Sequence, residues 1–194
     1  MGKFINREEA WELLCEYTKS AALRTHALAV EAAMLHFAAL EGLTGAEAEK
    51  WGVVGLLHDF DYEKFPDEHC VKSAELLREH GLDEEYIHAV CSHGFGICTD
   101  VEPANKMEKV LYTIDELTGL INAACLLRPS RSVLDLELKS VKKKFKDLNF
   151  AAGVNREIIQ KGCAMLGADL DEIITQTIAG MRARAEALGL KGNL

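Results

Sequence analysis

The sequence predicts an all-α protein, built as a helical bundle with a C-terminal helical extension. Apolar residues recur at helical spacing in nearly every segment between turn signals, rather than in the alternation typical of strands. Only three prolines, Pro66, Pro103 and Pro129, interrupt the chain of 194 residues. A chain of this length can bury a full core, and no linker is long enough to demand a second domain. We therefore expect residues 1–194 to form a single domain.

Turn and capping residues divide the sequence into consecutive helices. Thr44 and Glu47 form the pattern of a capping box, and Gly81 is a typical helix end. Asn155 and Asp169 are expected to cap the last two helices. The sequence predicts helices over residues 8–19, 21–40, 44–58, 66–81, 83–93 and 106–126, then a basic segment at 139–147 and helices beginning near residues 155 and 169.

The charge balance and the length of the apolar runs narrow the class of protein. The chain carries 22 Lys and Arg against 31 Asp and Glu, a formal net charge of -9. Because proteins that bind nucleic-acid polymers usually present a basic surface, we expect no such partner. No apolar run approaches the roughly 20 residues of a membrane span. We therefore expect no membrane partner and a cytoplasmic location, and the sequence predicts no particular oligomeric state.

Six cysteines are scattered along the chain without a Cys-x-x-Cys pair. Free cysteines are most often small buried hydrophobic residues, and thiols stay reduced in the cytoplasm. We therefore interpret all six as reduced core residues: Cys15, Cys70, Cys91, Cys98, Cys125 and Cys163.

The stretch LLHDFD at residues 56–61 ends an aliphatic segment with charge-capable groups. A buried aspartate is costly unless a partner neutralises it, so this stretch either caps a helix or binds a ligand. More histidines and an aspartate follow on the neighbouring predicted helices. Singly each is uninformative, but the ordered set spans five consecutive helices and indicates a metal site: His26, His58, Asp59, His69, His93 and Asp115. The three other histidines are interpreted as structural or surface residues: His36, His80 and His88.

This order of residues resembles the HD superfamily of metal-dependent phosphohydrolases, whose motif reads H…HD…D. The two histidines between the HD pair and the last aspartate are similar to those of its two-metal branch. The resemblance covers about residues 20–125, the expected metal-binding core, and leaves about 126–194 as the helical extension. It implies a first metal ion held by His26, His58, Asp59 and Asp115. It also implies a second ion held by His69 and His93, with Asp59 as the bridge.

The mixed imidazole and carboxylate set has a chemical preference of its own. It suits Fe or Mn, which we expect, with Zn, Co or Ni as alternatives, rather than Ca, which prefers oxygen ligands. A bridging carboxylate can hold two cations about 3.5–4 Å apart, and such a pair acidifies a water molecule into a nucleophile. The expected cofactors are therefore two divalent metal ions, and the expected chemistry is hydrolytic.

Asp59 and Asp61 are the expected catalytic carboxylates. Asp61 is predicted to orient the attacking water or a ligand histidine, and the alternative is a surface residue at a helix end. Several HD subfamilies carry a lysine four residues after the HD histidine, where this chain has Tyr62. Lys64, two positions further on, is the candidate to replace that lysine in contacting substrate phosphate.

Three further cations are candidates for binding the substrate. Arg24 precedes His26 by two residues, and a guanidinium suits bidentate contact with phosphate. Lys106 and Lys109 begin the helix that carries Asp115. The glycine-containing loop 94–105 is a candidate lining of the pocket. The lysines of segment 139–147 are interpreted as a solvated helix face.

Three functions are compatible with the ligand set. The first is hydrolysis of a small phosphoester or a nucleotide, and the ligand order resembles that of symmetrical diadenosine tetraphosphate hydrolases. The second is a di-iron oxygenase, because the same order resembles the inositol oxygenases, although we recognise none of their substrate-binding elements. The third is a regulatory module that binds a nucleotide without turnover. Because all six ligands are present, the sequence favours catalysis over regulation, and because hydrolases are the larger group, we expect a hydrolase with a small phosphorylated molecule as its partner.

Overall fold

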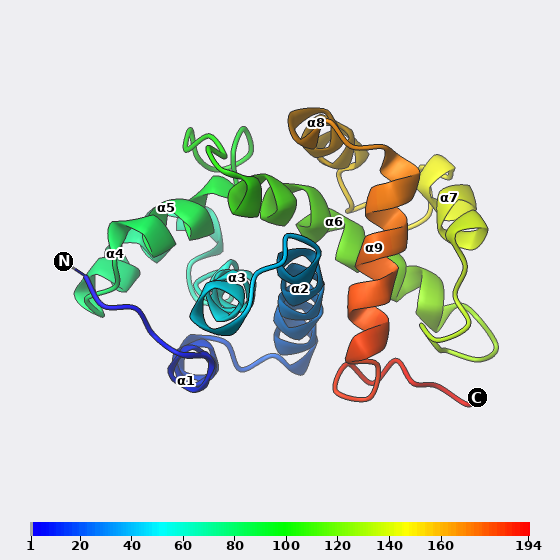
Figure 1. Ribbon diagram of the computed structural model, residues 1–194, viewed down its shortest axis with the longest axis horizontal. Coiled ribbons are helices and arrows are strands. Elements are labelled where there is room, and N and C mark those ends of the chain that lie inside the picture. Colours follow the sequence, from blue (N-terminus) through cyan, green and yellow to red (C-terminus); the bar gives the residue numbers. More distant parts are fainter. Residues whose placement is uncertain (1) are drawn as a thin grey trace.

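Helices α2 (Ala21–Leu40), α3 (Gly45–Leu57) and α6 (Lys106–Leu126) form the centre of the structure, and the other helices pack around them (Figure 1). The computed structural model describes residues 2–194. Across that range the secondary structure is helical, apart from two isolated β-bridges that join Lys3 to Leu82 and Phe95 to Thr99. The prediction of an all-α fold is therefore confirmed.

Shorter helices flank this centre on both sides. Helices α4 and α5 lie at one end of the long axis of the molecule, α7 lies towards the other, and α8 lies beside α6 between them (Figure 1). Their bounds are α1 (Arg7–Tyr17), the 3-10 helix η1 (Pro66–Glu68), α4 (Val71–Glu79), α5 (Glu84–Ser92), α7 (Leu138–Lys146), α8 (Arg156–Leu166) and α9 (Leu170–Ala183).

Local sequence sets most of the helix ends. Asn105 and Glu108 form a capping box at the start of α6, in which each side chain accepts a hydrogen bond from the backbone of the other residue. Asn155 and Asp169 cap α8 and α9 through their side-chain oxygens, as predicted. Gly167 ends α8 with a φ of +62°, a left-handed conformation that costs glycine little.

Two predictions about helix starts were wrong. Thr44 is the N-cap of α3, but its side chain makes no capping hydrogen bond. The next residue, Gly45, has a φ of +57°, so the first turn lacks the backbone geometry that a capping box requires. The single helix expected over 66–81 is interrupted, because η1 stops at Glu68 and α4 begins only at Val71. His69 and Cys70 therefore lie in a non-helical break.

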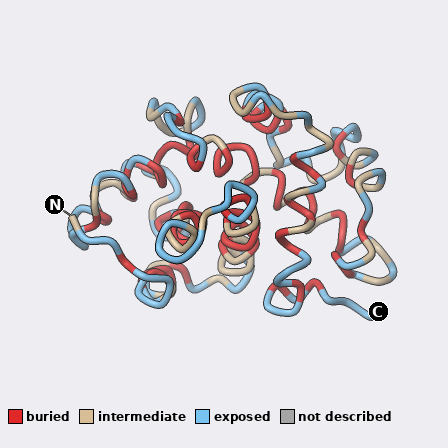
Figure 2. Tube along the Cα trace, viewed as in Figure 1, coloured by how far each residue is buried: buried red, intermediate tan, exposed pale blue. Residues whose placement is uncertain are grey.

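The buried faces of the helices point towards α2, α3 and α6 (Figure 2). Glycines allow these helices to approach one another closely. A Cβ on Gly55 of α3 would lie 2.8 Å from Met34 Cγ on α2. A Cβ on Gly180 of α9 would lie 2.8 Å from Ala33 Cα on the other side of α2. Helix α2 therefore packs closely between α3 and α9, and this packing fixes the backbone that carries His26.

The C-terminal helices share the hydrophobic core of the preceding ones. Helices α8 and α9 pack on α6 and α2, and one core cluster contains both Leu56 and Ile174. The guanidinium of Arg156 is buried and donates to main-chain carbonyls in the connection between α7 and α8, including those of Ala151 and Val154. The division into a core and an extension stays a prediction. None of the helices in residues 2–194 has the length and apolar character needed to cross a membrane.

The close packing of α2 and α9 gives a test of the fold. We expect Gly180→Ala to lower the free energy of unfolding by about 1–3 kcal/mol, because its Cβ would meet backbone atoms that cannot move aside. Urea denaturation measures this. Gly119→Ala on α6 is the matched control, since its Cβ would meet no atom closer than 3.8 Å and alanine favours helix by about 1 kcal/mol. Equal stability of the two variants would contradict the close α2–α9 contact.

Candidate metal centre

Four side chains from helices α2 and α6 and from the turn that follows α3 form a first ligand group: His26, His58, Asp59 and Asp115. The Nε2 atom of His26 lies 2.9 Å from Asp115 Oδ1. The Nε2 atom of His58 lies 3.2 Å from the same oxygen and 3.3 Å from Asp59 Oδ2. One ligating atom from each of the four residues lies within 4.8 Å of the others. Helices α2, α3 and α6 therefore bring together residues that are up to 89 positions apart in the chain.

Asp59 also belongs to a second group. Its other oxygen, Oδ1, lies 3.2 Å from His69 Nε2 and 3.3 Å from His93 Nε2. The two imidazole nitrogens are 3.1 Å apart. Asp59 thus presents one carboxylate oxygen to each group, which is the arrangement expected of a bridging carboxylate.

Two of the ligand histidines lie at the C-terminal ends of helices and use the same local device. His58 follows α3, and its Nδ1 donates to the carbonyl of Gly55, three residues earlier, at 2.8 Å. His93 follows α5, and its Nδ1 donates to the carbonyl of Val90, also three residues earlier. Each ring therefore satisfies a carbonyl that the helix end leaves free and fixes the tautomer in which Nε2 is the ligand. The negative end of each helix dipole also favours a cation there.

Asp61 orients the third histidine, His69. Its Oδ1 accepts from His69 Nδ1 at 2.7 Å, and its Oδ2 accepts from the backbone N–H groups of Cys70 and Ser73 at 3.2 and 3.0 Å. The side chain is fully buried. Of the roles predicted for Asp61, the structure supports orienting a ligand histidine and contradicts a surface position. Because its oxygens are engaged with these groups, we describe Asp61 as a positioning residue rather than a catalytic one.

The donor set fits a metal ion. Since the Nδ1 atoms of His58, His69 and His93 donate to carbonyl or carboxylate oxygens, their Nε2 atoms carry lone pairs. These lone pairs converge on the carboxylate oxygens of Asp59 and Asp115, so that acceptor faces acceptor. Only a cation or a proton between them relieves the repulsion. Nitrogen and carboxylate ligands suit Fe, Mn, Zn and similar divalent ions.

The charges around the site favour protons in this place when no metal is bound. Burial disfavours the charged form of His58, but the carboxylates of Asp59 and Asp115 outweigh it and raise the pKa of His58 well above its usual range. Burial also disfavours the charged form of His69, but hydrogen bonds to Asp59 and Asp61 outweigh it and raise the pKa of His69 to about 10. Burial would raise the pKa of Asp115, but His58 and His26 hold it below its usual range. Metal binding must therefore displace protons.

Comparison with known proteins agrees with this geometry. The family model described as HD domain matches residues 23–120, which is just over half of the chain and includes all six ligand residues. This chain belongs to the HD domain family. Neither a curated protein nor a solved structure matches it. The HD domain assignment places the chain in a superfamily of metal-dependent phosphohydrolases, whose members bind divalent metals.

The cations predicted to bind substrate mostly have other partners. Arg24 donates from Nε to the carbonyl of Thr18 at 2.7 Å and from Nη2 to that of Cys15 at 3.1 Å, so it ties α2 to the end of α1. Lys64 Nζ lies 4.1 Å from the ring centroid of Tyr17. These contacts do not support the predicted phosphate contacts of Arg24 and Lys64.

The two lysines at the start of α6 differ from each other. Lys106 lies nine residues before Asp115 in the chain and forms an ion pair with Glu41 at 2.6 Å. This contact does not support the predicted role of Lys106 in binding phosphate. Lys109 is half-buried, and within residues 2–194 it forms no ion pair. Its role as a substrate-binding residue stays a prediction.

The residues set aside as structural have structural partners. His36 Nε2 lies 2.8 Å from Gln176 Oε1, and His88 Nδ1 lies 3.0 Å from Glu108 Oε1. In segment 139–147, Lys142 forms an ion pair with Asp171, and Lys144 Nζ lies 4.5 Å from the centroid of the Phe150 ring. Both lysines are on α7, and these contacts fit the interpretation of a helix face rather than an anion site.

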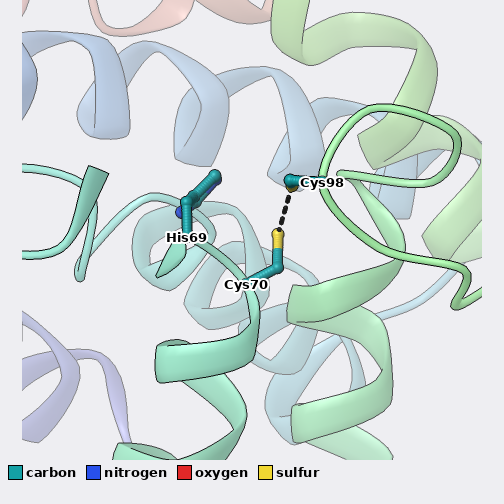
Figure 3. Close-up of side chains that lie close together, drawn as sticks. All are labelled: His69, Cys70 and Cys98. Carbon is teal, nitrogen blue, oxygen red and sulfur yellow. Dashed lines mark hydrogen bonds between the residues drawn. The ribbon is translucent and has the colours of Figure 1, made fainter. Parts of the chain in front are cut away.

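Sequence reasoning missed one feature, a pair of thiols beside the second ligand group. Cys70 Sγ and Cys98 Sγ are 3.2 Å apart, next to His69 (Figure 3). The hydrogen bond between the two lowers the pKa of Cys98 to about 6 and raises that of Cys70. All six cysteines are free, but this contact shows that two of them are more than isolated core residues. Because Cys70 and Cys98 are 28 residues apart in the chain, no sequence motif indicates that they meet.

The shared position of Asp59 predicts how metal content responds to substitution. We expect Asp59→Ala to remove both metal ions, because Asp59 belongs to both groups, and His93→Ala to remove only the second. Elemental analysis of purified variants measures the stoichiometry. His80→Ala is the control, since His80 is an exposed histidine outside both groups. Equal metal loss in the Asp59 and His93 variants would contradict two groups that share one carboxylate.

The contacts of Asp61 predict a selective effect on the second group. Asparagine has one acceptor oxygen, so Asp61→Asn cannot serve both His69 Nδ1 and the N–H groups of Cys70 and Ser73. We expect the affinity for the second metal to fall about 10- to 100-fold, with the first unchanged. Competition with a chelator measures both affinities. Glu63→Gln is the matched control, because Glu63 also accepts two backbone N–H bonds but contacts no ligand residue. An unchanged second affinity would contradict the positioning role.

Proposed function

We propose that this protein is a phosphohydrolase that cleaves a small phosphoester or a nucleotide at a dinuclear metal site. The observation that carries the proposal is the position of Asp59, whose two oxygens face different ligand groups. A carboxylate placed in this way is suited to bridging two ions. Membership of the HD domain family supports the same chemistry.

The residues of the chain have separate tasks in this proposal. His26, His58 and Asp115 would hold one ion, and His69 and His93 would hold the other, with Asp59 shared by the two groups. Ions bound there supply two things, an acidified water molecule as the nucleophile and neutralisation of charge on the phosphoryl oxygens. The protein keeps His58 and His93 buried and fixes their tautomers, so that the ligand atoms are preorganised.

The exposure of the ligands indicates where a substrate would enter. The side chains of His26, Asp59 and Asp115 are 25%, 21% and 19% exposed, whereas those of His69 and His93 in the second group are 11% and 4% exposed. Access to the centre is therefore from the side of the first group. Glu116, next to Asp115, adds a further carboxyl near this opening, and burial raises its pKa.

The proposed substrate is a small molecule rather than a polymer. The net charge of -9 repels an extended polyanion. Most of the predicted phosphate-binding cations are engaged elsewhere, so the metal ions would carry most of the contact with phosphate. Of those cations, Lys109 on α6 is the one we keep as a candidate for contact with substrate.

An activity screen tests the proposal. We expect the purified protein to release phosphate or a nucleoside monophosphate from at least one nucleotide, dinucleoside polyphosphate or sugar phosphate in the presence of Mn, Fe, Co or Zn. We expect Asp115→Ala to lower the rate at least about 100-fold, because a transition-state contribution of several kcal/mol is lost with the first ion. His36→Ala, whose histidine bonds Gln176, is the control and should retain activity within a few-fold.

Two results would contradict the hydrolase. Turnover that consumes O2 and requires iron, with no phosphate released, would support an oxygenase instead. Binding of a nucleotide by metal-replete protein without any turnover would support a sensing module.

A further inference from the structure

Two cysteines from distant parts of the chain meet beside the second ligand group. Cys70 follows His69, and Cys98 lies in the loop that follows His93. Their sulfur atoms are 3.2 Å apart and point towards each other (Figure 3). The pair therefore connects the two segments that carry the histidines of the second group.

The surrounding backbone is shaped around the two sulfur atoms. Cys70 has a φ of +66°, a left-handed conformation that is strained for a residue other than glycine. Gly94 leaves room for both thiols, because a Cβ there would lie 2.3 Å from Cys98 Sγ and 2.6 Å from Cys70 Sγ. The turn is closed by hydrogen bonds from the N–H groups of Ile97 and Cys98 to the carbonyl of Gly94, at 2.9 and 3.0 Å. The loop thus holds Cys98 against Cys70.

A metal ion shared by His69, Cys70 and Cys98 does not fit this arrangement. His69 Nδ1 is bonded to Asp61, and His69 Nε2 faces Asp59 and His93, so no nitrogen of the ring remains for a further ion. Two thiolates on one zinc ion are about 3.8 Å apart, given Zn–S bonds of about 2.3 Å in tetrahedral geometry. The observed separation is shorter. The two sulfur atoms need to approach by only about 1 Å to reach the sulfur–sulfur bond length of a disulfide.

We propose that Cys70 and Cys98 form a reversible disulfide, a redox modification site that links the loop after His93 to the segment after His69. The oxidant is a low-molecular-weight disulfide such as oxidised glutathione. Cys98 is partly exposed, whereas Cys70 is 1% exposed, so Cys98 attacks first.

The exchange balances in two steps. The Cys98 thiolate attacks one sulfur of the small disulfide, a mixed disulfide forms, and one small thiolate leaves and takes up a proton. The Cys70 thiol then loses its proton and attacks the Cys98 sulfur of the mixed disulfide, which releases the second small thiolate. Two protein thiols are oxidised and one small disulfide is reduced to two thiols.

The disulfide would close a loop of the chain that begins directly after His69 and contains His93. Closing the bond between residues 70 and 98 joins two points that are otherwise connected through α4 and α5. Because a disulfide limits the unfolded chain, the oxidised protein should resist denaturation more strongly than the reduced protein.

Thiol counting in a glutathione buffer tests the proposal. The full chain in its metal-loaded form is equilibrated with mixtures of oxidised and reduced glutathione, its free thiols are alkylated, and its peptides are mapped by mass spectrometry. We expect four alkylated cysteines under oxidising conditions and a peptide pair joined through Cys70 and Cys98, with six alkylated cysteines after reduction. The denaturation midpoint should rise on oxidation.

Matched variants separate this pair from general thiol oxidation. Cys98→Ser should abolish both the linked peptide and the shift in midpoint. Cys15→Ser, a partly exposed cysteine on α1, should leave both unchanged. Six free thiols at every glutathione ratio, or a link from Cys70 to Cys91, would overturn the proposal. These readouts do not depend on hydrolysis, so they hold or fail separately from the proposed function.

Discussion

The centre of this protein is defined by acceptor atoms that face one another. The Nε2 lone pairs of the ligand histidines and the carboxylate oxygens of Asp59 and Asp115 converge within a few ångströms, partly shielded from water. Such a cluster is unstable unless positive charge lies inside it. Metal ions or protons must therefore be part of the folded molecule. Compensation of this charge favours the close packing of α2, α3 and α6.

The fold holds the converging ligand side chains in place mainly through the ends of helices. His58 and His93 both follow the last turn of a helix and bond back to a carbonyl of that turn, so the helix end orients the ligand and is itself satisfied. Asp115 comes from the middle of α6, with a rigid backbone on both sides. Asp61 supplies for His69 the orientation that a helix end supplies for the other two. Preorganisation of this kind lowers the cost of binding each ion.

The sequence was sufficient for the parts of the structure that depend on local signals. Helical spacing and capping residues predicted the bounds of α2 and α6, and the order of histidines and aspartates predicted the residues that converge. The break at His69 and Cys70 was missed, because the left-handed conformation of a cysteine has no local signal and depends on tertiary contacts. The partners of Arg24 were missed for a similar reason, since the free carbonyls at the end of α1 become visible only when α1 and α2 are placed. The contacts of Arg24 and Lys106 do not support their predicted roles in binding phosphate, which stay predictions.

The two ligand groups are anchored to different parts of the fold. His26, His58 and Asp115 lie on or next to helices that pack against one another at the centre, whereas His69 and His93 border α4 and α5, which pack on each other and, through α5, on α3 and α6. Supersecondary units such as this helix pair often open as one cooperative step in native proteins. Local opening of α4 and α5 would separate His69 and His93 from Asp59 while the other three ligands stay in place. In such an opening the centre would divide at Asp59, so that the outer ligands separate from the inner ones.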